Sequence, residues 1–196
     1  MANKAIRLPV DEAAIRALAV GDEVEISGVM ITARDAAHKY MVESDAAEVR
    51  ELLRGGIIYH CGPVVARDGA GWRFVAAGPT TSIREEPYEH EVIRRYGLRG
   101  VIGKGGMGPR TLEACKLHGA VYLHAIGGLA VLLAQAVKQV RAVHRLEEFG
   151  PPEAMWVIEV ERFPAVVTMD AHGRSLHAEV LERSTARARE LMRTFT

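Results

Sequence analysis

The sequence contains few cysteines, which limits the metal and redox chemistry that this chain can perform alone. The two that it has, Cys61 and Cys115, lie far apart, within or beside expected core elements. An iron–sulfur cluster takes four protein ligands, or three where one iron stays open, so two cysteines cannot hold one. We therefore expect both cysteines to be buried free thiols.

The chain also lacks an excess of charge of either sign and any long apolar run. Lys+Arg and Asp+Glu are equal at 25 each, so no long-range field favours nucleic acid or an acidic membrane surface. No apolar run reaches the roughly 18 residues of a membrane span. The N-terminal segment has neither the apolar stretch nor the cleavage site of a signal peptide. We expect a cytoplasmic protein without nucleic-acid or membrane partners.

The chain is long enough and apolar enough to form one hydrophobic core. With 196 residues, 48% of them hydrophobic, a single domain over residues 1–196 is expected. The first 78 residues are β-rich and include a bulge-like interruption at Gly28 and a hairpin formed by residues 64–67 and 72–77. From Pro87 onward helices and strands alternate, which is typical of βαβ units with parallel strands. The expected fold class is α/β.

The last third of the chain is expected to hold one long helix, two strands and a final helix. Residues 127–146 predict a helix whose first turns are deeply buried, because residues 129–140 are almost wholly apolar. Separate strands are expected at 155–160 and 165–169. Residues 176–195 predict a charged amphipathic helix with a solvated polar face.

A polar turn follows the expected strand of residues 72–77. Gly78 and Pro79 end that strand, because proline cannot donate a hydrogen bond to a ladder. Three hydroxyl residues come next on a loop with free backbone N–H groups: Thr80, Thr81 and Ser82. Arg84 lies one helical turn beyond Thr80, which favours anion binding by this loop. A helix opened by Pro87 then runs to Gly97.

A second polar turn, Gly103-Lys104-Gly105-Gly106, follows a strand expected at 98–102. Its glycines allow a tight turn that presents one ammonium group at a strand end, where open α/β sheets bind ligands. The turn matches the dinucleotide-binding pattern GxGxxG, but no Asp or Glu stands near Gly127-Gly128, about 20 residues on, where that site requires one. A Walker A loop is excluded too, because Gly105 stands where that motif has Ser or Thr.

Arg34 is a third candidate cation, at the presumed junction between the early β stretch and a helix. We interpret Asp35 as a helix N-terminal charge, and His38 and His60 as locally packed residues. The loops at Gly78, Gly103 and Gly127 are expected to converge on one edge of a sheet.

Together these residues predict half of an active site. Two guanidinium groups, from Arg34 and Arg84, and the ammonium of Lys104 suit a small ligand with two carboxylates. A strong acid, base or metal ligand is missing from the motifs. Thr80 can transfer a proton only if another group lowers the cost of its ionisation, and no carboxylate or imidazole is paired with it in the motif.

Five segments resemble a known family: TARDAAHK, IYHCGPVV, GPTTSIR, LRGVIGKGGMG and WVIEVERFPAVVTMDAHG, in that order. They are similar to the β subunit of the class I, iron–sulfur-dependent fumarate hydratases and to the related L-tartrate dehydratase β subunit. The C-terminal domain of the single-chain enzymes is similar as well. The resemblance covers nearly the whole chain.

The resemblance implies a swivelling β/β/α domain with a mixed sheet. It also implies a partner α subunit that carries a 4Fe–4S cluster with one open iron, in an α2β2-type assembly, with no metal ligand in this chain. Thr80 is implied as the base for a carbon-bound proton, activated by an aspartate of the partner. Arg34, Arg84 and Lys104 are implied to hold the substrate carboxylates. The supporting loop residues are Gly78, Thr81, Ser82, Gly103 and Gly105.

The expected reaction is the reversible hydration of fumarate to L-malate, because TARDAAHK looks nearer to the fumarases. Conversion of tartrate to oxaloacetate remains an alternative, since the substrates differ by one hydroxyl group. Two further alternatives are a non-catalytic assembly or regulatory subunit, and a self-sufficient enzyme acting on a small phosphorylated or carboxylated metabolite.

Overall fold

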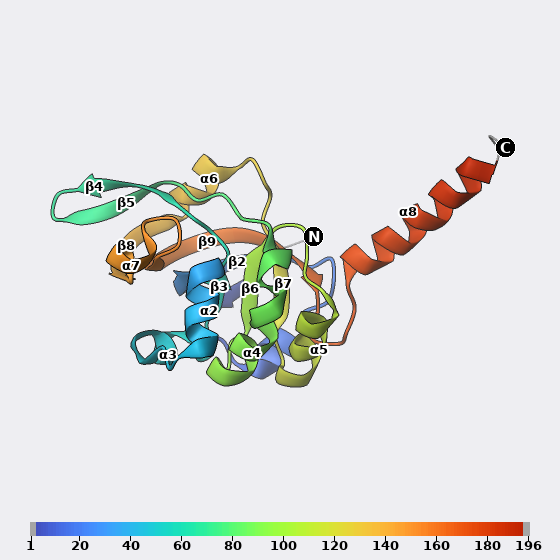
Figure 1. Ribbon diagram of the computed structural model, residues 1–196, viewed down its shortest axis with the longest axis horizontal. Coiled ribbons are helices and arrows are strands. Elements are labelled where there is room, and N and C mark those ends of the chain that lie inside the picture. Colours follow the sequence, from blue (N-terminus) through green and yellow to red (C-terminus); the bar gives the residue numbers. More distant parts are fainter. Residues whose placement is uncertain (1–2, 194–196) are drawn as a thin grey trace.

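The chain folds around a seven-stranded mixed sheet, seen in the computed structural model, which describes residues 3–193 (Figure 1). The strands of this sheet are β1 (Lys4–Arg7), β2 (Glu23–Thr32), β3 (Ile57–Tyr59), β6 (Gly100–Gly103), β7 (Val121–His124), β8 (Val137–His144) and β9 (Met155–Met169). Their order is β1-β2-β3-β6-β7-β9-β8. The α/β class and the mixed sheet predicted from the sequence are thus confirmed.

Strands β2, β3, β6 and β7 run parallel, so their carboxyl ends meet at one edge of the sheet. The helices that connect them are α2 (Asp35–Glu43), α3 (Ala47–Leu53), the 3-10 turn η1 (Ser82–Glu85), α4 (Glu86–Tyr96) and α5 (Pro109–His118). Helix α4 has Pro87 in its first turn and ends at Gly97, whose φ of 64° is left-handed. Both features agree with the prediction, because proline suits a first turn and glycine a left-handed cap.

Strand β9 turns the sheet back on itself. It pairs antiparallel with β2, as in Val24 with Ala165, and its end pairs with β7, as in Leu123 with Val167. The bulge expected at Gly28 is present as a shift in the β2–β9 register. A strand that pairs with both ends of a parallel set encloses apolar side chains on one face of the sheet.

The sheet separates two cores. Inside its curl lie Tyr59, Trp156 and Phe163, all fully buried. On the other face, helices α2 to α5 cover β3, β6 and β7 (Figure 1) and bury side chains such as Leu53 and Val92.

The two cysteines are free and buried, as predicted, and they lie in different cores, Cys61 in the first and Cys115 in the second. Burial raises the pKa of the Cys61 thiol to about 12 and also raises that of Cys115. Both thiols are therefore protonated at neutral pH, which keeps them unreactive.

The predicted hairpin forms a separate two-stranded sheet, β4 (Val64–Asp68) and β5 (Gly71–Ala76). It packs on the curled sheet through aromatic rings. The ring centroids of Trp72 and Phe74 lie 5.5 and 6.0 Å from that of Trp156, both edge-on. The hairpin is thereby fixed over the end of the first core.

The prediction of one long helix over residues 127–146 is wrong for the part that follows Gln135. Helix α6 covers only Ala130–Gln135, and the chain continues as β8. Strand β9 offers an edge to pair with, and Val137 and Val140 pack on the first core from β8. Branched side chains favour a strand under these conditions. The predicted burial is also wrong, because Val131 is 64% exposed.

The two strands expected at 155–160 and 165–169 are one continuous strand, β9. The interruption expected between residues 160 and 165 is absent, and Pro164 stands opposite Glu25 within the β2–β9 pairing. Arg162 has a φ of 52°, in the left-handed region, and lies at the shift in the β2–β9 register between Val160 and Phe163.

Three helices complete the described chain: α1 (Glu12–Arg16), α7 (Leu146–Phe149) and α8 (Leu176–Arg193). Helix α8 leads away from the body of the molecule (Figure 1) and is exposed along most of its length. It matches the predicted charged helix, whose last two residues, 194–195, lie outside the described range. No helix within residues 3–193 has the length and apolar character needed to cross a membrane.

Candidate active site

The candidate site lies where the parallel strands end. Strand β3 leads into His60 and β6 into Lys104, and the segment that starts at Thr80 crosses between them. The Thr80 N–H donates to the His60 carbonyl at 2.8 Å, and the Lys104 N–H donates to the Thr80 carbonyl at 3.2 Å. The Ser82 N–H donates back to the Lys104 carbonyl at 3.0 Å. Backbone hydrogen bonds therefore join the two polar turns.

The loop at Gly127 belongs to the same edge. The Ala77 N–H donates to the Ala130 carbonyl at 2.8 Å, and a Cβ added to Gly78 would lie 3.2 Å from the Ala130 side chain. A Cβ on Gly127 would lie 3.6 Å from the Lys104 side chain. The three junctions converge as predicted, although β5 belongs to the hairpin and not to the main sheet.

Thr80 presents its hydroxyl in an unusual setting. Its Oγ1 is buried and has no hydrogen-bond partner within residues 3–193. A buried hydroxyl without a partner costs free energy, so such groups are rare and often have a functional reason. Of its neighbours, Thr81 is exposed and Ser82 is fully buried.

The three predicted cations differ in their surroundings. Arg34 lies 3.3 Å from Glu153 Oε1 and is 19% exposed, whereas Arg84 contacts the carboxylate of Asp35 and is 57% exposed. Lys104 has no ion pair among the residues that the structure describes. Both guanidinium groups are thus oriented by carboxylates of the same chain, and the ammonium group of Lys104 remains open to a ligand.

Gly103 is required by the packing behind this edge. A Cβ at this position would lie 1.8 Å from Ser82 Oγ and 3.1 Å from the Tyr122 hydroxyl. Since real Cβ atoms do not approach so closely, any larger residue would displace Ser82. Gly105 has a φ of 84° in an open part of the turn, a conformation that favours glycine.

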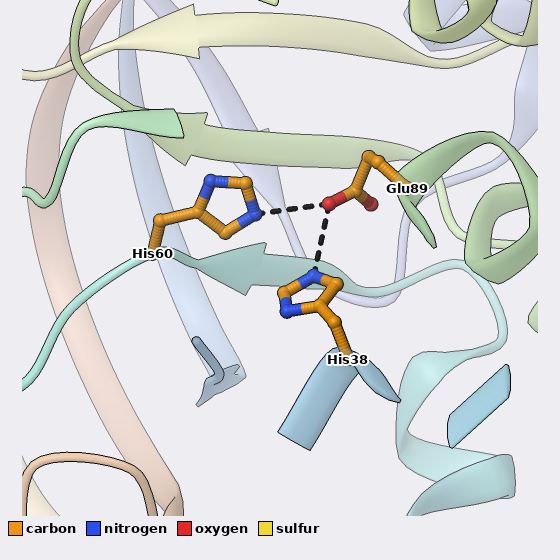
Figure 2. A group of neighbouring side chains, drawn as sticks. All are labelled: His38, His60 and Glu89. Carbon is orange, nitrogen blue, oxygen red and sulfur yellow. Dashed lines mark hydrogen bonds and ion pairs between the residues drawn. The ribbon is translucent and has the colours of Figure 1, made fainter. Parts of the chain in front are cut away.

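Sequence reasoning missed a buried group directly beneath the candidate site. Figure 2 shows Glu89 between two imidazole rings: its Oε2 lies 2.9 Å from His38 Nε2 and 2.9 Å from His60 Nε2. All three side chains are fully buried. His38 and His60 are packed, as interpreted, but they are also linked to the site. The available signal was Glu89, which shares the apolar face of α4 with Val92 and Ile93.

Charge is fixed within this buried group. Burial alone would lower the pKa of His38, but the carboxylates of Glu89 and Glu85 outweigh it and raise the pKa to about 9. Burial would raise the pKa of Glu89, but the two imidazoles lower it to about 2. Burial lowers the pKa of His60. At neutral pH the group therefore holds a cationic His38, an anionic Glu89 and a neutral His60.

We expect stability to depend on pH through His38. Its pKa is raised from 6.5 to about 9, so its contribution is complete below pH 6.5 and is lost as the pH rises through 9. The upper limit is about 3 kcal/mol, because one pKa unit corresponds to about 1.4 kcal/mol. Urea unfolding of the wild type and of His38→Gln at pH 6.5 and at pH 9 measures the loss in free energy of unfolding. An equal pH dependence in the two proteins would contradict this assignment.

A mixed α/β domain with basic loops at the carboxyl ends of its parallel strands is typical of proteins that bind anionic ligands at that edge. Comparison with known proteins names the family. A model described as fumarase C-terminus matches residues 2–180, so the chain belongs to this family. The resemblance seen in the motifs is confirmed.

Several relatives match over most of this chain. A putative class I fumarate hydratase of Geobacillus stearothermophilus is 53% identical over 180 residues, which cover 91% of this chain and 34% of that protein. The L(+)-tartrate dehydratase subunit beta of Escherichia coli (strain K12) is 38% identical, covering 90% of this chain and 88% of its own length. A putative L(+)-tartrate dehydratase subunit beta of Methanocaldococcus jannaschii is 40% identical, covering 91% and 93%. The chain thus spans about a third of the Geobacillus relative and most of the two named subunits.

Proposed function

We propose that this chain is the β component of an iron–sulfur hydro-lyase that interconverts fumarate and L-malate. The observation that carries the proposal is the Thr80 hydroxyl. It is buried without a hydrogen-bond partner in the described chain, at an edge where backbone hydrogen bonds join its own turn to the turn of Lys104. The Geobacillus relative, named a putative class I fumarate hydratase and 53% identical, supports the choice of fumarate.

In this proposal the side chains at this edge have two roles, substrate binding and proton transfer. Lys104, Arg34 and Arg84 hold the two carboxylates of the substrate, and the guanidinium groups grip them as bidentate forks. Their positive charge also stabilises the carbanion that forms next to one carboxylate. Thr80 Oγ1 takes the proton from carbon. Thr80 has no hydrogen-bonded base in residues 3–193, so the group that activates it comes from a partner.

The partner in this proposal is an α subunit that carries a 4Fe–4S cluster. The donor set of this chain agrees, because its two cysteines lie in separate cores and cannot supply three or more thiolates to one cluster. A cluster with one open iron supplies Lewis-acid activation of the hydroxyl that leaves. An α2β2-type assembly of the two chains is part of the same proposal.

An exposed apolar segment beside the site supports a partner at this edge. The segment runs from Ile126 to Leu132 through the Gly127 junction. Ile126 is 58% exposed, Val131 64% and Leu132 53%. Clustered apolar side chains of this size are typical of surfaces that another protein covers.

L-tartrate dehydratase is the second candidate, with tartrate converted to oxaloacetate. Its support is length: the two relatives named L(+)-tartrate dehydratase subunit beta are matched over 88% and 93% of their own chains. They are separate chains of similar size to this one. A subunit that keeps the fold for assembly or regulation, without chemistry, is a third candidate.

One experiment separates these candidates. The chain is purified without oxygen together with a candidate cluster-bearing subunit, and the complex is assayed with fumarate, L-malate and tartrate. We expect fumarate and malate to be interconverted by the complex and by neither chain alone. Turnover of tartrate only would favour the second candidate. Activity of this chain alone, or a partner without a cluster, would contradict the proposal.

A further inference from the structure

The buried group under the candidate site extends into a chain of hydrogen bonds. His60 Nδ1 lies 2.9 Å from Ser82 Oγ, and the Tyr122 hydroxyl donates to Ser82 Oγ at 2.8 Å. The Ser82 N–H also donates to the Lys104 carbonyl at 3.0 Å, which joins the second polar turn to this chain. At the other end, His38 Nδ1 lies 2.9 Å from the Arg34 carbonyl oxygen.

The acceptors at each end determine where the protons lie. A backbone carbonyl only accepts, so His38 Nδ1 must carry a proton that it donates to Arg34. The Nε2 atoms of His38 and His60 both face Glu89 Oε2. Both Nε2 atoms are therefore expected to carry protons and to donate them to an ionised Glu89. This arrangement is favoured over a protonated Glu89 because imidazole is more basic than a carboxyl group. His38 is then an imidazolium.

His60, in contrast to His38, is neutral. Its Nε2 donates to Glu89, and its ring centroid lies 5.0 Å from that of the His38 cation, which disfavours a second positive charge. A neutral His60 leaves Nδ1 as an acceptor, so the Ser82 hydroxyl donates to it. Every nitrogen of both rings then has a hydrogen-bond partner, whereas Glu89 Oε1 is buried without one in the described chain.

We propose that this chain of hydrogen bonds fixes the relative positions of the three loops that carry the substrate-binding residues. This proposal rests on the proposed function and adds to it how the substrate-binding residues are held in place. The members of the chain, in order, are Tyr122, Ser82, His60, Glu89, His38 and the Arg34 carbonyl, and the Lys104 carbonyl joins the chain at Ser82.

Each loop is anchored within two residues of its functional side chain. The Lys104 carbonyl accepts from the Ser82 N–H, and Ser82 lies midway between Thr80 and Arg84. The third anchor is the carbonyl of Arg34 itself. Because the anchors are buried and directional, a shift of one loop breaks a hydrogen bond in the core. His38, His60 and Glu89 are positioning residues in this arrangement.

Tyr122→Phe tests the positioning, because it removes one hydroxyl from the chain and keeps the ring. The matched control is Tyr96→Phe, which also removes a buried hydroxyl, one bonded to the Met41 carbonyl at 2.9 Å. Hydrogen exchange is followed at the amides of Thr80, Ser82 and Lys104, which carry the bonds that join the two turns. We expect exchange at least about tenfold faster in Tyr122→Phe only, the effect of losing roughly one hydrogen bond. Equal exchange in both variants would overturn the proposal.

Nitrogen-15 NMR of histidine-labelled protein tests the proton positions, with His38→Gln and His60→Gln used to assign the signals. At pH 8 we expect both ring nitrogens of His38 to be protonated and His60 to carry its proton on Nε2. A neutral His38 at that pH would overturn the assignment.

In the two-chain enzyme, Tyr122→Phe is expected to raise KM about tenfold with a smaller change in kcat, and Tyr96→Phe to change neither. An unchanged KM would overturn the positioning role. If the wild-type complex has no hydro-lyase activity, the proposed function fails, and the exchange and NMR measurements still decide this inference.

Discussion

Thr80→Val is expected to lower the kcat of the two-chain enzyme by a factor of about 10²–10⁴, the usual contribution of a positioned proton-transfer group. Valine has nearly the shape of threonine, so the substrate pocket keeps its form. Substrate affinity should change little, since the carboxylates are held by other residues. The loss is measured by steady-state kinetics with fumarate and with L-malate.

The thermal stability of the Thr80→Val variant serves as an internal control for the kinetic experiment. Because Thr80 Oγ1 is buried without a partner in the described chain, replacing it with a methyl group removes no known hydrogen bond. Removing an unsatisfied buried polar atom is neutral or stabilising. Thr80→Val should therefore unfold at the same temperature as the wild type or higher. Thr185→Val on α8, away from the site, should change neither rate nor stability. A Thr80→Val enzyme with a wild-type rate would exclude Thr80 as the base.

Arg84→Ala is expected to lower kcat/KM by about 10²–10³, the range found when one donor to developing charge is removed. The guanidinium of Arg84 contacts the carboxylate of Asp35, and the side chain is 57% exposed. Asp35→Asn should give a smaller loss, because the guanidinium remains but its orientation is less fixed. Arg84→Lys should recover only part of the activity, since lysine lacks the bidentate fork.

Arg94 provides a matched control for Arg84. Its guanidinium is 58% exposed and is paired with Glu91 on α4, so it has similar exposure and a similar ion pair. Arg94→Ala removes the same charge from the surface without touching the candidate site, and kcat/KM should stay within about twofold because exposed pairs contribute little. Equal losses in Arg84→Ala and Arg94→Ala would mean that net charge, and not carboxylate binding, causes the effect.

Local sequence signals predicted much of the fold. Pro87 and Gly97 mark the first turn and the end of α4, and Gly28 marks the bulge in β2. The hairpin of β4 and β5 was also predicted. Such features depend on neighbouring residues, whose steric and hydrogen-bonding limits act over a few positions.

Features set by distant partners were not predicted correctly. Residues 137–144 read as a helix by composition but form a strand, because the edge of β9 supplies hydrogen bonds that the local sequence does not reveal. The interruption expected between residues 160 and 165 is absent for a similar reason, since pairing with β2 continues through Phe163 and Pro164. Tertiary pairing overrides local preference in both cases.

The sequence by itself determined the family motifs, the cations and hydroxyls that stand in polar turns, and the shortage of cysteine that prevents this chain from holding a cluster. Only the tertiary structure decided that His38 and His60 share Glu89, which lies 51 and 29 positions away in the chain. Ionisation depends on burial and on charges that meet through space. A histidine that is cationic and one that is neutral therefore look alike until the fold brings their partners together.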